Sequence, residues 1–109
     1  MKVRVLRPAL EDLIAGRCFY DRRGVGVGDY FLQALFAEVD SLARYGGIHR
    51  IQFGFHRSLA KKFPCAVYYR VIAHGAVVFR ILDCRQNPNW IREALQAEHL
   101  WEDAQAKPS

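Results

Sequence analysis

The chain has 109 residues, of which 51% are hydrophobic and 25% are charged, and its formal net charge at pH 7 is +5. This length predicts one domain with a single core, and no apolar run reaches the roughly 18 residues that a membrane-spanning helix needs. The basic N-terminus is not followed by the long apolar stretch of a signal peptide. The sequence therefore predicts a cytoplasmic protein without membrane contact.

Three cysteines, Cys18, Cys65 and Cys84, suit a reducing compartment as small apolar residues. The chain has no Cys-x-x-Cys pair, and its histidines and cysteines lack zinc-finger spacing. The sequence therefore predicts neither a metal site nor a cofactor.

The N-terminal part predicts a strand and a helix. Residues 2–7 mostly alternate polar and apolar side chains, as a short strand does, and Pro8 ends that strand and suits the first turn of a helix. Apolar side chains then follow at helical spacing: Leu10, Leu13, Ile14 and Cys18. This helix should stop before Gly24.

A glycine-rich joint at residues 24–28 precedes a second helix, for which Asp29 is the predicted N-cap. The joint lacks the Lys-Ser/Thr of a P-loop and the full GxGxxG spacing, so it favours a hinge over phosphate binding. The helix ends at Gly46-Gly47, and its apolar face is predicted to carry Phe31, Leu32, Leu35, Phe36, Val39 and Leu42. A short connection between two helices predicts an antiparallel helical hairpin.

The second half of the chain predicts antiparallel strands. Residues 48–55 fit an edge strand or an extended loop, a strand should include Arg57, and Pro64 marks the start of the next one. Two further strands, at about 65–73 and 76–84, should form a hairpin with His74-Gly75 as its turn.

That turn places Cys65 opposite Cys84 and sorts the hairpin onto two faces, which a bulge would exchange. One face carries Val67, Tyr69, Val71, Val78, Arg80, Leu82 and both cysteines. The other carries Ala66, Tyr68, Arg70, Ile72, Val77, Phe79, Ile81 and Asp83.

A final helix is predicted after Pro88, with Trp90, Ile91, Ala94 and Leu95 along one side. The last ten residues are polar and predicted to be frayed. The predicted order is therefore strand, two-helix hairpin, three antiparallel strands and a C-terminal helix, which is a small α+β fold.

Basic residues dominate the second half of the chain. Residues 49–92 contain one acid, Asp83, against eight basic residues: Arg50, Arg57, Lys61, Lys62, Arg70, Arg80, Arg85 and Arg92. Such a basic sheet predicts an anionic partner, either a nucleic acid or an acidic protein segment. The candidate residues for binding a target or an anion are Arg57, Lys61, Lys62, Arg70, Arg80 and Arg85. The alternative is structural: the arginines stack on aromatic rings, and the lysines protect a sheet edge.

Catalysis has fewer candidates. Cleavage of RNA needs a base near the 2′-hydroxyl, an acid for the leaving oxygen and cations for the phosphate. His49 and His56 form the one credible histidine pair, because each stands beside an arginine in the less regular segment. Of this pair, His56 is retained as a catalytic candidate.

Several short motifs in this order resemble the RelE/ParE superfamily of toxins from bacterial type II toxin–antitoxin systems. They are residues 9–13 (Ala-Leu-Glu-Asp-Leu), Gly28 with Phe31 and Leu35, residues 57–64 (Arg-Ser-Leu-Ala-Lys-Lys-Phe-Pro), residues 67–71 (Val-Tyr-Tyr-Arg-Val), and Asp83-Cys-Arg85 with Pro88. The resemblance covers about residues 1–97, expected to be a single toxin domain, and leaves 98–109 as a polar tail.

The resemblance implies a growth-inhibiting toxin of a plasmid stabilisation-like module, neutralised by a cognate and often acidic antitoxin encoded beside it. RelE-like members cut messenger RNA in the ribosome, whereas ParE-like members poison DNA gyrase. Ala66 stands where RelE-like members can carry an arginine, and Ile91 where a tyrosine can follow the last strand. The resemblance therefore favours the ParE-like branch and a protein that is not an enzyme. Arg57 and Arg85 still match basic positions of the RelE-like members, so the resemblance adds them to His56 as catalytic candidates. The alternatives are a ribosome-dependent RNA endonuclease that uses these residues and a non-toxic module that binds an antitoxin or nucleic acid.

Overall fold

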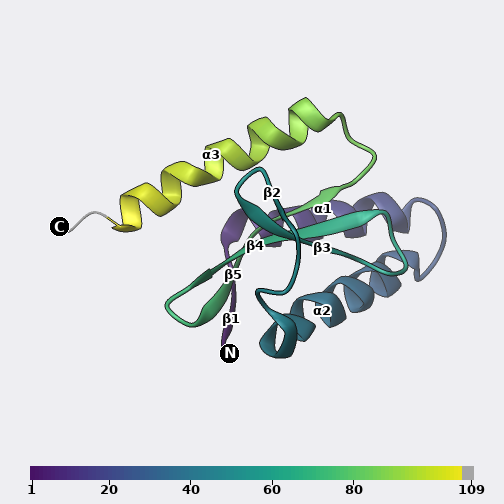
Figure 1. Ribbon diagram of the computed structural model, residues 1–109. Helices are drawn as coiled ribbons and strands as arrows, with labels where there is room; N and C mark the ends of the chain where they lie inside the picture. Colours follow the sequence, from purple (N-terminus) through teal and green to yellow (C-terminus); the bar gives the residue numbers. More distant parts are fainter. Residues whose placement is uncertain (107–109) are drawn as a thin grey trace.

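The computed structural model of the protein describes the backbone of residues 1–106 and the side chains of residues 1–98. Its elements are β1 (Val3–Val5), α1 (Arg7–Asp21), α2 (Val27–Tyr45), β2 (Ile51–Gln52), β3 (Phe55–Leu59), β4 (Cys65–Ile72), β5 (Gly75–Asp83) and α3 (Pro88–Ala106). This arrangement confirms the predicted α+β fold and element order (Figure 1). The segment predicted as an edge strand or an extended loop contributes the two-residue strand β2.

The five strands form one sheet in the order β1-β5-β4-β3-β2. Neighbouring strands are antiparallel except β1, which runs parallel to β5 with Val3 opposite Ala76 and Val5 opposite Val78. The first and last strands of the chain are therefore neighbours. Such pairing over a long sequence separation leaves no local pattern in the sequence.

The sheet separates two hydrophobic cores, where the length of the chain predicts a single one. One core lies on the face covered by α1 and α2, and it joins Leu13, Leu35 and Leu42 to alternate residues of β4 and β5. The other lies on the face covered by α3 (Figure 1), where Ile91 and Leu95 pack with buried side chains of the sheet. Because both faces are covered, β4 is buried at five consecutive positions, Cys65 to Tyr69.

The hairpin turn lies one residue earlier than predicted. Ile72 pairs with Gly75, so the two turn residues are Ala73 and His74, with φ of 51° and 64°. Positive φ at both positions matches the right-handed twist of the strands in a two-residue hairpin. Together with a β-bulge further along the hairpin, this turn places Cys65 opposite Asp83, and the predicted pairing with Cys84 is wrong.

A β-bulge also corrects the predicted faces. Tyr68 pairs with Arg80 while Tyr69 pairs with Val78, which leaves Phe79 as the extra residue. Beyond the bulge, Arg80 lies on the face of Tyr68, whereas the prediction places these two residues on opposite faces. The same shift moves Ile81 into the core under α1 and α2, and Leu82 into the core under α3.

The two N-terminal helices end where the glycines predict. The helix α1 stops at Asp21, before Gly24, and α2 stops at Tyr45, before Gly46-Gly47. Their predicted buried faces are partly wrong, because Leu10, Ile14, Cys18 and Phe36 are exposed. Helical spacing identifies an apolar stripe, but the angle at which a helix crosses the sheet decides which part of that stripe is buried.

The start of α2 differs from the prediction in its cap. The N-cap residue is Gly26, with a φ of 81°, and Asp29 lies within the first turn, where a carboxylate still favours the positive end of the helix dipole. The backbone N–H of Gly28 donates to Asp21 Oδ1 at 3.0 Å, which ties the start of α2 to the end of α1.

The C-terminal helix is longer than the sequence predicts. Ile91 and Leu95 are buried as predicted, whereas Trp90 is exposed. The backbone stays helical through Ala106, where fraying is predicted, and residues 107–109 lie outside the described part of the chain. The division between a domain at 1–97 and a tail at 98–109 stays a prediction.

Candidate functional site

Two of the predicted binding arginines lie on the sheet face that α3 partly covers. The Nε of Arg57 in β3 donates to the hydroxyl of Tyr68 in β4 at 3.2 Å. The guanidinium of Arg70 lies 4.0 Å from the ring centroid of Phe55, and its Nε donates to the carbonyl of Gly54 at 2.9 Å. Both side chains are half-buried. This face therefore carries two half-buried cations over buried aromatic rings, and such cations can bind an anion.

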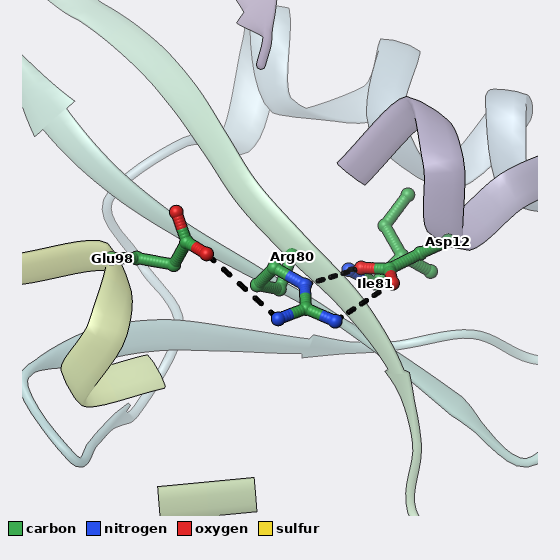
Figure 2. Close-up of polar contacts among 4 residues, drawn as sticks. All are labelled: Asp12, Arg80, Ile81 and Glu98. Carbon is green, nitrogen blue, oxygen red and sulfur yellow. Dashed lines mark hydrogen bonds and ion pairs between the residues drawn. The ribbon is translucent and has the colours of Figure 1, made fainter. Parts of the chain in front are cut away.

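Arg80 is held between two helices. Its Nε and one terminal nitrogen donate to the carboxylate of Asp12 in α1 at 2.7 and 2.9 Å, and its other terminal nitrogen lies 3.8 Å from Glu98 in α3 (Figure 2). The Arg80 side chain is only 18% exposed. The hydrogen bond to Asp12 raises the pKa of this guanidinium, while burial raises the pKa of Glu98. The predicted binding role of Arg80 stays a prediction, and the contacts of this structure give the residue a structural role.

The Asp12 carboxylate also accepts a hydrogen bond from a backbone N–H of β5. The strand β1 pairs with β5 only as far as Val78, and the N–H of Ile81 beyond it donates to Asp12 Oδ2 at 2.9 Å (Figure 2). The carboxylate thus accepts three hydrogen bonds close to the bulge. No sequence motif indicates this role of Asp12, because its partners are 68 and 69 residues away.

Arg85 pairs with the acid nearest to it in the sequence. One terminal nitrogen of Arg85 lies 2.7 Å from Asp83 Oδ2, and its backbone N–H donates to Asp83 Oδ1 at 2.7 Å. The side-chain hydrogen bond from Arg85 lowers the pKa of the Asp83 carboxyl. The Arg85 side chain is 61% exposed, so it can still exchange this partner for an anion from solution.

Lys61 and Lys62 lie in the connection between β3 and β4, on the side of α2. Both are exposed, and the Lys62 ammonium lies 5.1 Å from the ring centroid of Tyr30. They border a groove of about 570 Å³ that follows α2. The two lysines are thus separated by the sheet from Arg57 and Arg70.

His49 and His56 gather around Tyr69, a buried residue that the sequence analysis does not single out. The His56 ring stacks on the Tyr69 ring with centroids 5.0 Å apart, and its Nδ1 donates to the carbonyl of His49 at 2.6 Å. The Tyr69 hydroxyl accepts the Gly47 N–H at 2.9 Å and is hydrogen-bonded to His49 Nδ1. Burial lowers the pKa of His49 and raises the pKa of Tyr69. This cluster holds the segment between α2 and β2 against the sheet.

The three catalytic candidates do not converge. Arg57 is on the α3 face, His56 packs on Tyr69 on the opposite face, and Arg85 binds Asp83 beyond the end of β5. Neighbouring residues of a strand point to opposite sides of a sheet, which separates His56 from Arg57. Among the described residues, no group of three or more His, Cys, Asp or Glu side chains could hold a metal ion. Within the same residues, no helix is long and apolar enough to cross a membrane.

Comparison with solved structures finds the same fold in another protein. The chain is similar to a chain from the chromosomal ParDE toxin–antitoxin system of P. aeruginosa, with a TM-score of 0.64 and 22% sequence identity. The match covers 74% of this chain and 92% of the other. No family model and no curated protein matches the sequence. The similarity establishes a shared fold.

Proposed function

We propose that this protein is the toxin of a type II toxin–antitoxin module, inhibits growth by acting on DNA gyrase, and is neutralised by a cognate antitoxin. The observation that carries the proposal is the fold shared with a chain of a ParDE system, together with the sequence motifs that point to the same superfamily. A cytoplasmic location follows from either target, because DNA gyrase and ribosomes are both cytoplasmic.

The choice of gyrase rests on the arrangement of the candidate residues. A nuclease of this kind needs a general base, a general acid and phosphate-binding cations around one phosphodiester. Arg57, Arg85 and His56 lie on different sides of the sheet or beyond its end, so they support binding better than cleavage. In this proposal Arg57 and Arg85 bind a macromolecular target and do not cleave it.

The antitoxin is expected to be acidic and to be encoded beside this protein. A net charge of +5 favours an acidic partner, because complementary charge speeds association and suppresses wrong partners. Apolar side chains exposed on the helical hairpin offer a surface for such a partner: Leu10 and Ile14 of α1, and Phe36 of α2.

One observation keeps the RNA endonuclease as a second candidate. Arg57 Nε donates to the Tyr68 hydroxyl at 3.2 Å, which places a cation beside a phenol without a histidine. If this pair cleaved RNA, Arg57→Ala would abolish toxicity, and Arg85→Ala would weaken it. Toxicity that survives both substitutions would exclude this candidate.

The deciding experiment is pulse labelling of DNA and protein synthesis within minutes of inducing this chain in bacterial cells. We expect DNA synthesis to fall first, and the purified protein to perturb gyrase. An early loss of translation would favour the endonuclease. Normal growth with folded protein present would contradict a toxin of either kind, and rescue by co-expression of the adjacent reading frame would identify the antitoxin.

A further inference from the structure

The groove beside α2 combines an apolar lining with a basic rim. Its volume, about 570 Å³, is within the usual range for binding clefts and corresponds to a few amino-acid side chains. Residues of α2 form one wall, and the connections that follow α2 and β3 complete it.

Small and aromatic residues give the groove the shape of a docking site for a polypeptide. Ala34 and Ala37 are one helical turn apart on its wall, so the backbone of a partner can come close to α2. Large apolar side chains that line the groove remain exposed: Tyr45 at 52% and Ile48 at 73%. Exposed side chains of this size beside a concave surface are typical of a binding surface.

The charges of the groove indicate what kind of segment fits it. Lys61 and Lys62 are exposed on its rim, and neither forms an ion pair with a carboxylate in the described part of the chain. Glu38 also lines the groove, and its Oε1 accepts the hydroxyl hydrogen of the buried Ser58 at 2.7 Å. A carboxylate in the wall disfavours a phosphate backbone in the groove, whereas the lysines attract isolated carboxylates at the rim.

We propose that this groove binds an amphipathic, acidic peptide segment of a protein partner. Apolar side chains of the segment pack between Ala37 and Ile48, and its carboxylates bind Lys61 and Lys62. The identification of the partner as the antitoxin rests on the proposed function, but the binding itself does not depend on toxicity.

The test is selection of a peptide library on the purified full chain, followed by fluorescence anisotropy on the enriched peptides. We expect peptides that combine aspartate or glutamate with apolar residues. Their affinity should fall at least about tenfold for Ala37→Trp, which fills the groove from an exposed position, and no more than about twofold for the matched Ala43→Trp, which lies outside it.

A charge-reversal experiment tests the proposed peptide binding independently. The double variant Lys61→Glu/Lys62→Glu should bind the same peptides at least about tenfold more weakly at low salt, and this difference should shrink as salt rises. The control, Arg22→Glu/Arg44→Glu, changes the net charge equally at exposed positions outside the groove and should have a much smaller effect. Thermal unfolding of each variant checks that it is folded.

The outcomes separate this inference from the proposed function. Neutral or basic consensus peptides, peptides that bind Ala37→Trp as tightly as the unchanged chain, or no enriched peptide at all would overturn the inference. If the chain binds a single-stranded oligonucleotide and Lys61→Glu/Lys62→Glu abolishes that binding, the surface binds nucleic acid and not an acidic peptide. If the protein binds the acidic peptides as expected but leaves growth unchanged, the proposal of a peptide-binding groove stands and the proposal of a toxin fails.

Discussion

Removal of the Asp12 carboxylate should unfold the protein at markedly lower denaturant concentration. Asp12 accepts hydrogen bonds from Arg80 Nε at 2.7 Å, from a second Arg80 nitrogen at 2.9 Å and from the Ile81 backbone N–H at 2.9 Å. Asp12→Ala would leave a guanidinium that is only 18% exposed without its main partner and a backbone donor without an acceptor. We therefore expect a substantial loss of stability from a single truncation.

The magnitude follows from the burial of the pair. Breaking a buried ion pair by removing one partner costs about 3 to 5 kcal/mol. Because Asp12 and Arg80 keep some exposure to water, at 15% and 18%, we take the lower end, about 3 kcal/mol for Asp12→Ala. In a domain of this size that loss lowers the melting temperature by about 12 to 24 °C. Asp12→Asn keeps an acceptor for Ile81 and should lose about half as much.

Urea unfolding followed by circular dichroism measures this loss. The matched control is Glu11→Ala, which removes a neighbouring exposed carboxylate of α1 and should stay within about 0.5 kcal/mol of the unchanged chain. A double-mutant cycle of Asp12→Ala with Arg80→Met should give a coupling free energy above about 1.5 kcal/mol. A loss below about 1 kcal/mol for Asp12→Ala, or no coupling with Arg80, would refute the structural role of this pair.

Three further predictions concern separate sites. Burial raises the pKa of the Cys65 thiol to about 12, so iodoacetamide at mildly alkaline pH should alkylate the exposed Cys18 well before Cys65. Equal labelling rates by mass spectrometry would contradict this. Gly28→Ala would place a methyl group 2.6 Å from the backbone carbonyl oxygen of Arg17 and should cost about 1 to 3 kcal/mol of unfolding free energy; an unchanged urea midpoint would show that the helices can separate without cost. Burial lowers the pKa of His49 below its ordinary value of 6.5, so the unfolded chain binds more protons just below that pH, and stability should fall as the pH falls through that window. His49→Gln should remove that part of the pH dependence, and an identical profile would contradict the assignment.

The apolar pattern and the turn-forming residues of the sequence determine the elements themselves. The glycines before and after α2, Pro64 before β4 and the β-branched and aromatic residues of β4 and β5 predict segments that the structure confirms, because these features act within a few residues. The same local information explains why the order of an α+β fold is recognisable from this chain. It also identifies the basic residues of the second half as candidates for binding.

Only the tertiary structure decides which of these residues meet. A single extra residue, Phe79, moves Arg80 to the other face of β5. The parallel pairing of β1 with β5 ends at Val78, and the N–H of Ile81 beyond it therefore donates to Asp12. The stacking of His56 on Tyr69 likewise depends on the register between β3 and β4. Register and contacts between distant residues depend on packing across the whole sheet, and therefore no local pattern of this sequence encodes them.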